Sequence, residues 1–219
     1  MAVSLKRRVR VKHARKVKQV AVDISYIVSC YDRPGDLIVC LGSLLRQTHR
    51  SFEVIVTDNG APEFFKEHKR IIKFFNDTRV SHFATGKLKV SDCYWSAEYG
   101  AARAKGRYLC FPCDDCYYPP EWAIRMLQVA VESQADLIYN EFVLMGPESA
   151  GGSGVYQRWR PTPRRLVKSQ FLIRAAVFPG FSGKPKASVS ASADQVIGQE
   201  LMRAGRTFAC ARGLEAVHN

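Results

Sequence analysis

The stretch that decides the fold is Gly106-Arg-Tyr-Leu-Cys-Phe-Pro-Cys-Asp-Asp-Cys-Tyr-Tyr-Pro-Pro-Glu-Trp122. Its apolar run, Tyr108 to Phe111, predicts a short buried strand. The strand is followed by the adjacent carboxylates Asp114 and Asp115, and two prolines then open a helical stretch over 121–131. Carboxylates at the carboxyl end of a strand lie where open α/β sheets bind ligands.

The adjacent acids favour a cation between them. Two neighbouring anions repel each other, and a divalent cation relieves that repulsion. Mg²⁺ takes carboxylates together with substrate phosphates as ligands, so Asp114 and Asp115 predict a metal–diphosphate site. For the dipeptide alone, a solvated Asp-Asp turn before a helix is the competing interpretation.

This acidic segment resembles the "DXD" element of the nucleotide-sugar-dependent glycosyltransferases of family 2, which have the GT-A fold. Many members read Phe-Leu-Asp-x-Asp-Asp, and here Cys113 and Cys116 replace the first and last acids. The spore-coat polysaccharide type, which reads Thr-Asp-Asp-Asn, is the closer likeness, and its two acids fall on Asp114 and Asp115. The resemblance implies that Asp115, helped by Asp114, holds Mn²⁺ or Mg²⁺.

Earlier segments resemble the same family in the same order. Asp23-Ile-Ser-Tyr-Ile-Val-Ser-Cys-Tyr-Asp-Arg-Pro34 is similar to its first strand and loop, and Ser51-Phe-Glu-Val-Ile-Val-Thr-Asp-Asn-Gly60 to its second strand. The segment from Gly100 to Gly106 matches the family's Gly-x-x-x-Ala-x-Gly pattern, which precedes its third strand. A leucine stripe predicts an amphipathic helix over 37–47. The resemblance covers residues 22–130 well and 190–219 weakly.

Two residues in these segments suit a nucleoside. The ring of Tyr31, just past a strand, can stack on a nucleobase, worth roughly 1–3 kcal/mol; a packed core tyrosine is the alternative. Asp58 can accept from a base imide N–H, which favours uracil over cytosine, or it can form the turn at Asn59-Gly60. The resemblance implies that the nucleotide-binding residues are Cys30, Tyr31, Arg33, Asp58 and Asp114.

The final third is expected to contact the acceptor. Residues 146–165 and 178–192 are rich in loop-forming residues and predict two long loops. Asp194 opens a helix predicted over 193–205, where the resemblance implies the catalytic base; a helix-capping Asp is the alternative. His218 follows a strand end at 214–217, where the resemblance implies a further metal ligand, although a tail-end histidine is the competing interpretation.

Length and patterning indicate an α/β fold. The chain has 219 residues with 47% apolar content, which suits one domain with a large core. Strand-like runs alternate with helical stretches, which predicts a mostly parallel sheet flanked by helices on both faces; these runs are 24–30, 53–57, 79–84, 107–111, 136–144 and 206–211. We expect one GT-A domain over 20–219.

The N-terminal segment is strongly basic. Residues 1–19 hold eight Lys and Arg and no acid, within a net charge of +13. A solvated flexible tail and an arm that touches an anionic surface are both compatible with this pattern. We expect a tail that can contact an anionic membrane surface, and we do not expect nucleic acid as a partner. No secretory signal and no run of about 18 apolar residues is seen, so the expected location is cytoplasmic, at most peripheral at a membrane.

The cysteines admit a second metal hypothesis. Cys110, Cys113 and Cys116 form a C-x₂-C-x₂-C run that is typical of iron–sulfur proteins, but the fourth cysteine is absent. The chain has seven cysteines, and an odd count without a signal peptide favours reduced thiols. We therefore expect Cys110 in the core and the other two beside the acidic site.

Together these features predict a metal-dependent, inverting glycosyltransferase. It would move a sugar from a nucleotide sugar, with UDP as the expected nucleotide, to a hydroxyl of a glycan, lipid-linked or protein acceptor. One alternative is a non-catalytic basic module that binds anionic polymers. Another is a nucleotidyltransferase, which would require a Gly-rich, Lys-bearing phosphate loop near the first strand, and Ser29 to Gly35 is not such a loop.

Overall fold

The computed structural model describes residues 21–85, 93–144, 157–181 and 193–218. The basic tail predicted over 1–19 lies outside the described residues, as do parts of the loops predicted over 146–165 and 178–192.

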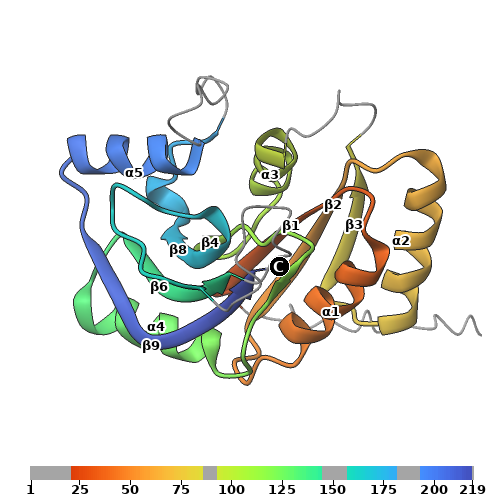
Figure 1. The fold of residues 1–219 in the computed structure, drawn as a ribbon, viewed down its shortest axis with the longest axis horizontal. Coiled ribbons are helices and arrows are strands. Elements are labelled where there is room, and N and C mark those ends of the chain that lie inside the picture. Colours follow the sequence, from red (N-terminus) through yellow and green to blue (C-terminus); the bar gives the residue numbers. More distant parts are fainter. Residues whose placement is uncertain (1–20, 86–92, 145–156, 182–192, 219) are drawn as a thin grey trace, which may run out of the picture.

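In the described residues, nine strands form one sheet in the order β3-β2-β1-β4-β8-β6-β9-β5, with β7 paired to β6 (Figure 1). Three of the parallel pairings, β1 with β2, β2 with β3 and β6 with β9, extend over five or more residues, whereas each antiparallel pairing covers two or three. The strands are β1 (Ile24–Cys30), β2 (Phe52–Asp58), β3 (Val80–Ala84), β4 (Tyr108–Cys110), β5 (Cys116–Tyr117), β6 (Leu137–Leu144), β7 (Gln157–Trp159), β8 (Phe171–Arg174) and β9 (Phe208–His218). The predicted α/β class with a mostly parallel sheet is confirmed.

Helices cover both faces of the sheet (Figure 1). Their bounds are α1 (Pro34–Leu45), α2 (Pro62–Phe75), α3 (Cys93–Ala101), α4 (Trp122–Ser133) and α5 (Ala193–Arg203), with 3₁₀ turns η2 (Lys168–Gln170) and η3 (Ala175–Val177). The first two helices begin at prolines, which lack only an N–H that a first turn leaves unpaired. None of the helices in the described ranges has the length and apolar character needed to span a membrane.

Strand β1 separates two hydrophobic clusters. Ile24, Tyr26 and Val28 pack with α1, α2 and α4, whereas Ile27 packs with α3 and α5 on the opposite face. Every residue of β1 is buried, as expected for a strand covered by helices on both sides. Because side chains alternate between the two faces of a strand, the residues at the end of β1 also point in turn toward each of the two helix layers.

The C-terminal strand differs from the prediction. A strand over 206–211 and a separate strand end over 214–217 were expected, but β9 is one strand with a register shift opposite Asn140 and Glu141. Gly213 has φ +66 within the shift, a conformation that glycine adopts without steric cost. Because the strand continues past this bulge, it reaches β5, where His218 pairs with Cys116.

Trp122 anchors α4 beneath the acidic segment. It is fully buried, its ring centroid lies 4.8 Å from that of Tyr118, and its Nε1 donates to Asn140 Oδ1 at 3.2 Å. Trp122→Ala should therefore lower the free energy of unfolding by about 3–5 kcal/mol in urea titrations. Ile124→Ala, at a half-exposed position of the same helix, should change it by less than half as much. Equal losses would contradict this account of the core.

Candidate functional site

A cavity of about 500 Å³ opens where β1 ends. Five of the residues that the sequence assigns to nucleotide or metal line it: Cys30, Tyr31, Arg33, Asp114 and Asp115. The cavity is therefore at the carboxyl ends of parallel strands, the position expected for a ligand in this class of sheet.

Backbone contacts fix the acidic segment against the end of β1. The amide of Ser29 donates to the carbonyl of Pro112 at 3.2 Å, and Ser29 forms a parallel bridge with Cys113. Just beyond this bridge, the amide of Tyr31 donates to Asp114 Oδ2 at 3.2 Å. The loop after β1 and the acidic loop after β4 therefore form one unit.

A guanidinium joins the two acids. Arg33 Nη2 lies 2.6 Å from Asp114 Oδ1, and its Nη1 lies 2.6 Å from Asp115 Oδ2. The carboxyl side chains are 1% and 6% exposed, whereas the arginine is 47% exposed. Burial raises the pKa of Asp114 to about 6, with a contribution from Asp115, although Arg33 opposes the shift. Both carboxylates thus converge on one positive group, an arrangement that also suits a hard divalent cation.

Thiols border the same acids. Cys113, Asp115 and Cys116 place one ligand atom each within 4.8 Å of one another, and Cys116 Sγ donates to Asp115 Oδ1 at 3.8 Å. Burial holds the pKa of Cys116 well above its usual range, so this thiol is protonated at neutral pH when no metal is bound. Among the described residues Cys110 belongs to the buried core, as predicted, and not to this group.

Asp58 is buried in a network of histidines. Its Oδ2 accepts from His68 Nδ1 at 3.0 Å and from His82 Nε2 at 2.9 Å, and its Oδ1 accepts from the amide of Gly60 at 2.9 Å. Burial alone would raise the pKa of Asp58, but the hydrogen bonds from the two histidines lower it to about 2. Asp58 is only 2% exposed and does not line the cavity. Its bond from Gly60 forms the predicted turn, and the two histidines hold it from α2 and β3.

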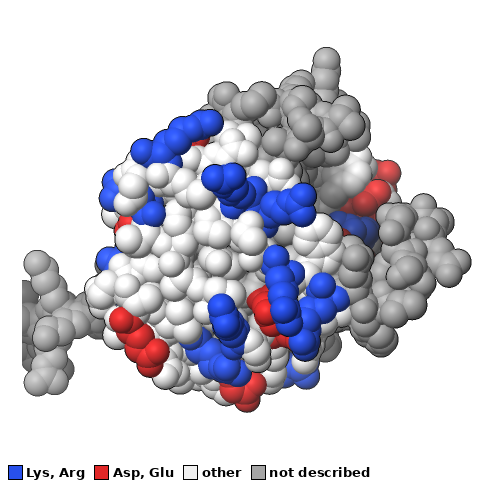
Figure 2. Space-filling model, turned by 60° about the vertical axis from the view of Figure 1, so that its left-hand side comes forward, with Lys and Arg blue, Asp and Glu red and all other residues white. Residues whose placement is uncertain are grey.

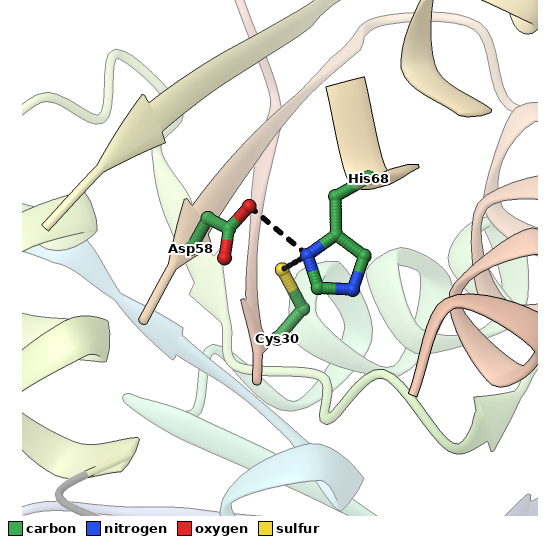
Figure 3. A group of neighbouring side chains, drawn as sticks. All are labelled: Cys30, Asp58 and His68. Atoms are coloured by element: carbon green, nitrogen blue, oxygen red, sulfur yellow. Dashed lines mark hydrogen bonds and ion pairs between the residues drawn. The ribbon is translucent and has the colours of Figure 1, made fainter. Parts of the chain in front are cut away.

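Cys30 contacts the same histidine (Figure 3). Its Sγ lies 3.8 Å from His68 Nδ1, the nitrogen that also faces Asp58. A catalytic Cys-His-Asp relay uses one ring nitrogen for the nucleophile and the other for the acid, so these three residues are not such a relay. Burial also holds the pKa of the Cys30 thiol well above its usual range. The cluster instead ties β1, β2 and α2 together.

Tyr31 presents its ring at the cavity. It is 37% exposed, and the turn after β2 packs against its backbone. A Cβ at Gly60 would lie 2.2 Å from the carbonyl oxygen of Tyr31, so only glycine permits this approach. The amide of Asn59 also donates to the carbonyl of Cys30 at 3.0 Å. The ring is therefore free to contact a ligand while its backbone is fixed.

Asp194 lies in the first turn of α5 and is 5% exposed. Its Oδ1 accepts from the hydroxyl of Tyr94 at 3.2 Å, and its Oδ2 accepts from the backbone amide of Lys168 at 2.9 Å. Tyr94 follows Cys93, which lines the cavity. The carboxylate is therefore connected to the cavity wall through α3.

His218 reaches the acidic segment through the backbone. It pairs with Cys116, the residue after Asp115, where β9 meets β5. The described part of the chain gives the backbone position of this residue only, so its role as a metal ligand stays a prediction.

Several cavity and network residues were not identified from the sequence. They are Asn59, Cys93 and Ser96 in the cavity wall, and His68 and His82 around Asp58. Asn59 carries a detectable signal, since it stands in the Asp-Asn-Gly turn. The others have none, because α2, α3 and β3 bring them to the site only through tertiary packing.

Sequence comparisons identify relatives of the chain. The family model described as "Glycosyl transferase family 2" matches residues 25–184. An uncharacterised glycosyltransferase of Rickettsia conorii is 31% identical over 112 residues, 50% of this chain and 18% of that protein. Another from Rickettsia bellii is 34% identical over 105 residues, 46% of this chain and 14% of that protein. The chain thus spans less than a fifth of the length of these relatives.

Solved structures share the fold. The crystal structure of S. aureus TarS 1–349 gives a TM-score of 0.64 at 17% identity, covering 90% of this chain and 58% of that chain. The same protein in complex with UDP-GlcNAc gives 0.63 at 15% identity, covering 90% and 56%, and in complex with UDP it gives 0.60 at 16%, covering 90% and 57%. The GT-A fold expected from the sequence is confirmed.

The histidine network around Asp58 should be visible as a pKa change. Ionised Asp58 contributes about 2 kcal/mol to the free energy of unfolding at neutral pH, because its pKa is about 2 in the folded protein instead of the ordinary 3.8. This stability is present above the unfolded pKa and is lost as pH falls toward about 2. His68→Phe removes one hydrogen-bond donor, so the pKa of Asp58 should rise, and the stability that ionised Asp58 contributes should be lost at a higher pH.

Carbon-13 NMR of the carboxyl groups measures this pKa directly, and acid unfolding measures the stability. His49→Phe is the matched control, since His49 pairs with Asp23 instead, at 3.1 Å. An unchanged Asp58 pKa in the His68 variant would show that His68 does not stabilise the carboxylate.

Proposed function

The chain belongs to glycosyl transferase family 2, and on that basis we propose that it transfers a sugar from a UDP-sugar to an acceptor hydroxyl, with inversion and with a divalent metal. The observation that carries this proposal is the pair of buried carboxylates, Asp114 and Asp115, that converge on one cation beside Tyr31 in a cavity of about 500 Å³. That volume suits a small-molecule ligand.

Asp115, with help from Asp114, would hold Mn²⁺ or Mg²⁺, and the metal would compete with the Arg33 guanidinium that now contacts both acids. A metal there supplies charge neutralisation for the departing nucleoside diphosphate. Arg33, displaced from the acids, would then be free to bind a phosphate oxygen, which its planar fork suits. The backbone position of His218, opposite Cys116, supports it as a further ligand.

The nucleoside would lie between Tyr31 and the end of β2. The exposed ring of Tyr31 suits stacking on the base. Asp58 Oδ1 accepts one bond, from Gly60, and its side chain is buried behind the cavity wall, so a bond from the imide N–H of uracil to this oxygen would require the turn at Asn59-Gly60 to move. Cys30, bonded to the same network, would form the adjacent wall. The TarS complex with UDP is a structural neighbour that supports this choice of nucleotide.

Asp194 is our candidate for the catalytic base. In an inverting reaction the acceptor hydroxyl attacks the anomeric carbon from the face opposite the leaving group, and a carboxylate accepts its proton. Tyr94 and the amide of Lys168 hold this carboxylate at the start of α5, on the α3 side of the cavity. Such base catalysis contributes typically about 10²–10⁴-fold. The acceptor class, whether glycan, lipid-linked or protein, and the contact of residues 1–19 with an anionic membrane surface remain parts of the proposal.

A non-catalytic polymer-binding module is the second candidate function. Figure 2 gives it one supporting observation, an arc of Lys and Arg side chains around an uncharged centre on one face. Acidic side chains interrupt that arc, however. A polymer-binding module also gives no role to two buried carboxylates that one arginine contacts. The other alternative, a nucleotidyltransferase, would need a Gly-rich phosphate loop, and the loop after β1 is not one. We therefore favour the transferase.

Metal-dependent binding of UDP is the first test. Calorimetry should detect UDP binding in Mn²⁺ that disappears in EDTA. Asp115→Ala should abolish it more completely than Asp114→Ala, because the family pattern retains the acid at 115. Asp136→Ala, away from the cavity, is the control. Equal UDP affinity with and without metal would exclude the metal bridge, and absence of UDP binding in both would refute the proposed nucleotide.

Asp194→Asn tests the base. The amide keeps the shape of the carboxylate and loses its basicity, so UDP affinity should stay within a few-fold while sugar transfer falls by about 10²-fold or more. A panel of UDP-sugars and acceptors scored for UDP release gives the rate. Glu132→Gln, exposed on α4, is the matched control. Transfer at the wild-type rate in the Asp194→Asn variant would assign the base to another residue.

A further inference from the structure

Lys168 is a buried cation without a hydrogen bond. It begins η2, it is 4% exposed, and its Nζ has no hydrogen-bond partner among the described residues. It is also the one Lys or Arg in the described ranges that is buried. An ammonium removed from water without a partner destabilises a protein, so a buried lysine of this kind favours a role in binding an anion.

The groups around the ammonium leave its charge unmatched. The acidic groups that interact electrostatically with it are Cys113, Cys93, Tyr94 and Asp194. Burial raises the pKa values of Cys93 and Tyr94, so both are neutral at neutral pH. Burial of Lys168 opposes its protonation, and the nearby carboxylate of Asp194 is the group that favours the charged ammonium at neutral pH and raises the pKa of Lys168.

The carboxylate of Asp194 does not supply a direct contact. Its two oxygens accept from the hydroxyl of Tyr94 and from the backbone amide of Lys168 itself. The ammonium is instead 5.7 Å from the centroid of the Tyr94 ring. It therefore has an anion nearby but no hydrogen bond to it, and it lies close enough to the Cys93 thiol to oppose the rise that burial causes in the pKa of that thiol.

The ammonium lies just behind the wall of the cavity. Cys93 and Cys113, its neighbours, both line the cavity next to Asp114 and Asp115. The segment that carries it is fixed to the acidic loop, because the hydroxyl of Tyr118 donates to the carbonyl of Ser169 at 2.6 Å. Lys168 thus approaches the cavity from the side of α3 and α5, whereas Arg33 approaches it from the loop after β1.

We propose that the ammonium of Lys168 binds a phosphate oxygen of the donor's diphosphate, on the side of the cavity formed by Cys93 and Cys113. This inference rests on the proposed function, since it assigns a subsite to the same donor. A diphosphate has more anionic oxygens than one cation at the acidic pair can take, and a buried ammonium gives a charge-assisted hydrogen bond. The backbone amide of the same residue positions Asp194, so one residue would serve both the leaving group and the base.

The test compares diphosphate with nucleoside binding. Calorimetry in Mn²⁺ is performed with UDP, uridine and inorganic pyrophosphate on the wild type and Lys168→Met. The variant should lose roughly ten- to hundredfold in affinity for UDP and pyrophosphate, the value of a charged hydrogen bond, and should bind uridine as the wild type does. Its ligand-free melting temperature should not fall, because a buried unpartnered charge has been removed.

Lys69→Met, at an exposed position of α2, controls for the loss of one positive charge and should leave all three affinities unchanged. Lys168→Gln, a polar neutral variant, replaces the methionine variant if the latter does not fold. The same ratio of UDP to uridine affinity in the Lys168 variants and the wild type would overturn the subsite.

The probes separate the two proposals. A wild type that binds pyrophosphate through Lys168 but neither UDP nor uridine would refute the nucleotide and retain the anion subsite. A wild type that binds neither UDP nor pyrophosphate would overturn both.

Discussion

The repulsion between two buried neighbouring carboxylates is the constraint on which the rest of this site depends. Asp114 and Asp115 are nearly inaccessible to water, so they require a positive group at short range. Among the residues that the structure describes, Arg33 meets both, and it can do so because β1 ends against the acidic loop, with Ser29 bonded to Pro112. The register of β1 beside β4 is thus a condition for the electrostatics of the cavity.

Local sequence patterns predicted the elements that lie within one segment. The strand–acid–proline order of 106–122 predicted β4 and α4. The adjacent acids and the first-strand motif pointed to Asp114, Asp115, Tyr31 and Arg33, which line the cavity. These inferences succeeded because strand propensity, proline placement and adjacent charges act over a few residues.

Long-range partners could not be predicted in this way. His68 and His82 reach Asp58 from α2 and β3, and Lys168 lies behind the cavity wall in a 3₁₀ turn before β8. Their positions follow from helix and strand packing, which leaves no periodic trace in the sequence. The prediction of two separate strands in place of β9 was wrong for a related reason. Gly213 lies in a bulge within one strand, and in the sequence a glycine in a bulge looks the same as a glycine in a turn.

The route of β9 has a consequence for how the protein acquires its site. This strand runs parallel to β6 along the sheet and then pairs with β5 directly after Asp115. Residues about a hundred positions apart in the chain must therefore meet before the acidic loop is enclosed, and pairing across such a separation forms slowly. During synthesis the first four strands and the acidic pair emerge well before β9. The newly made chain would therefore pass through a stage in which β6 is an open edge of the sheet, and the pairing of β9 both closes that edge and supports the segment that follows Asp115.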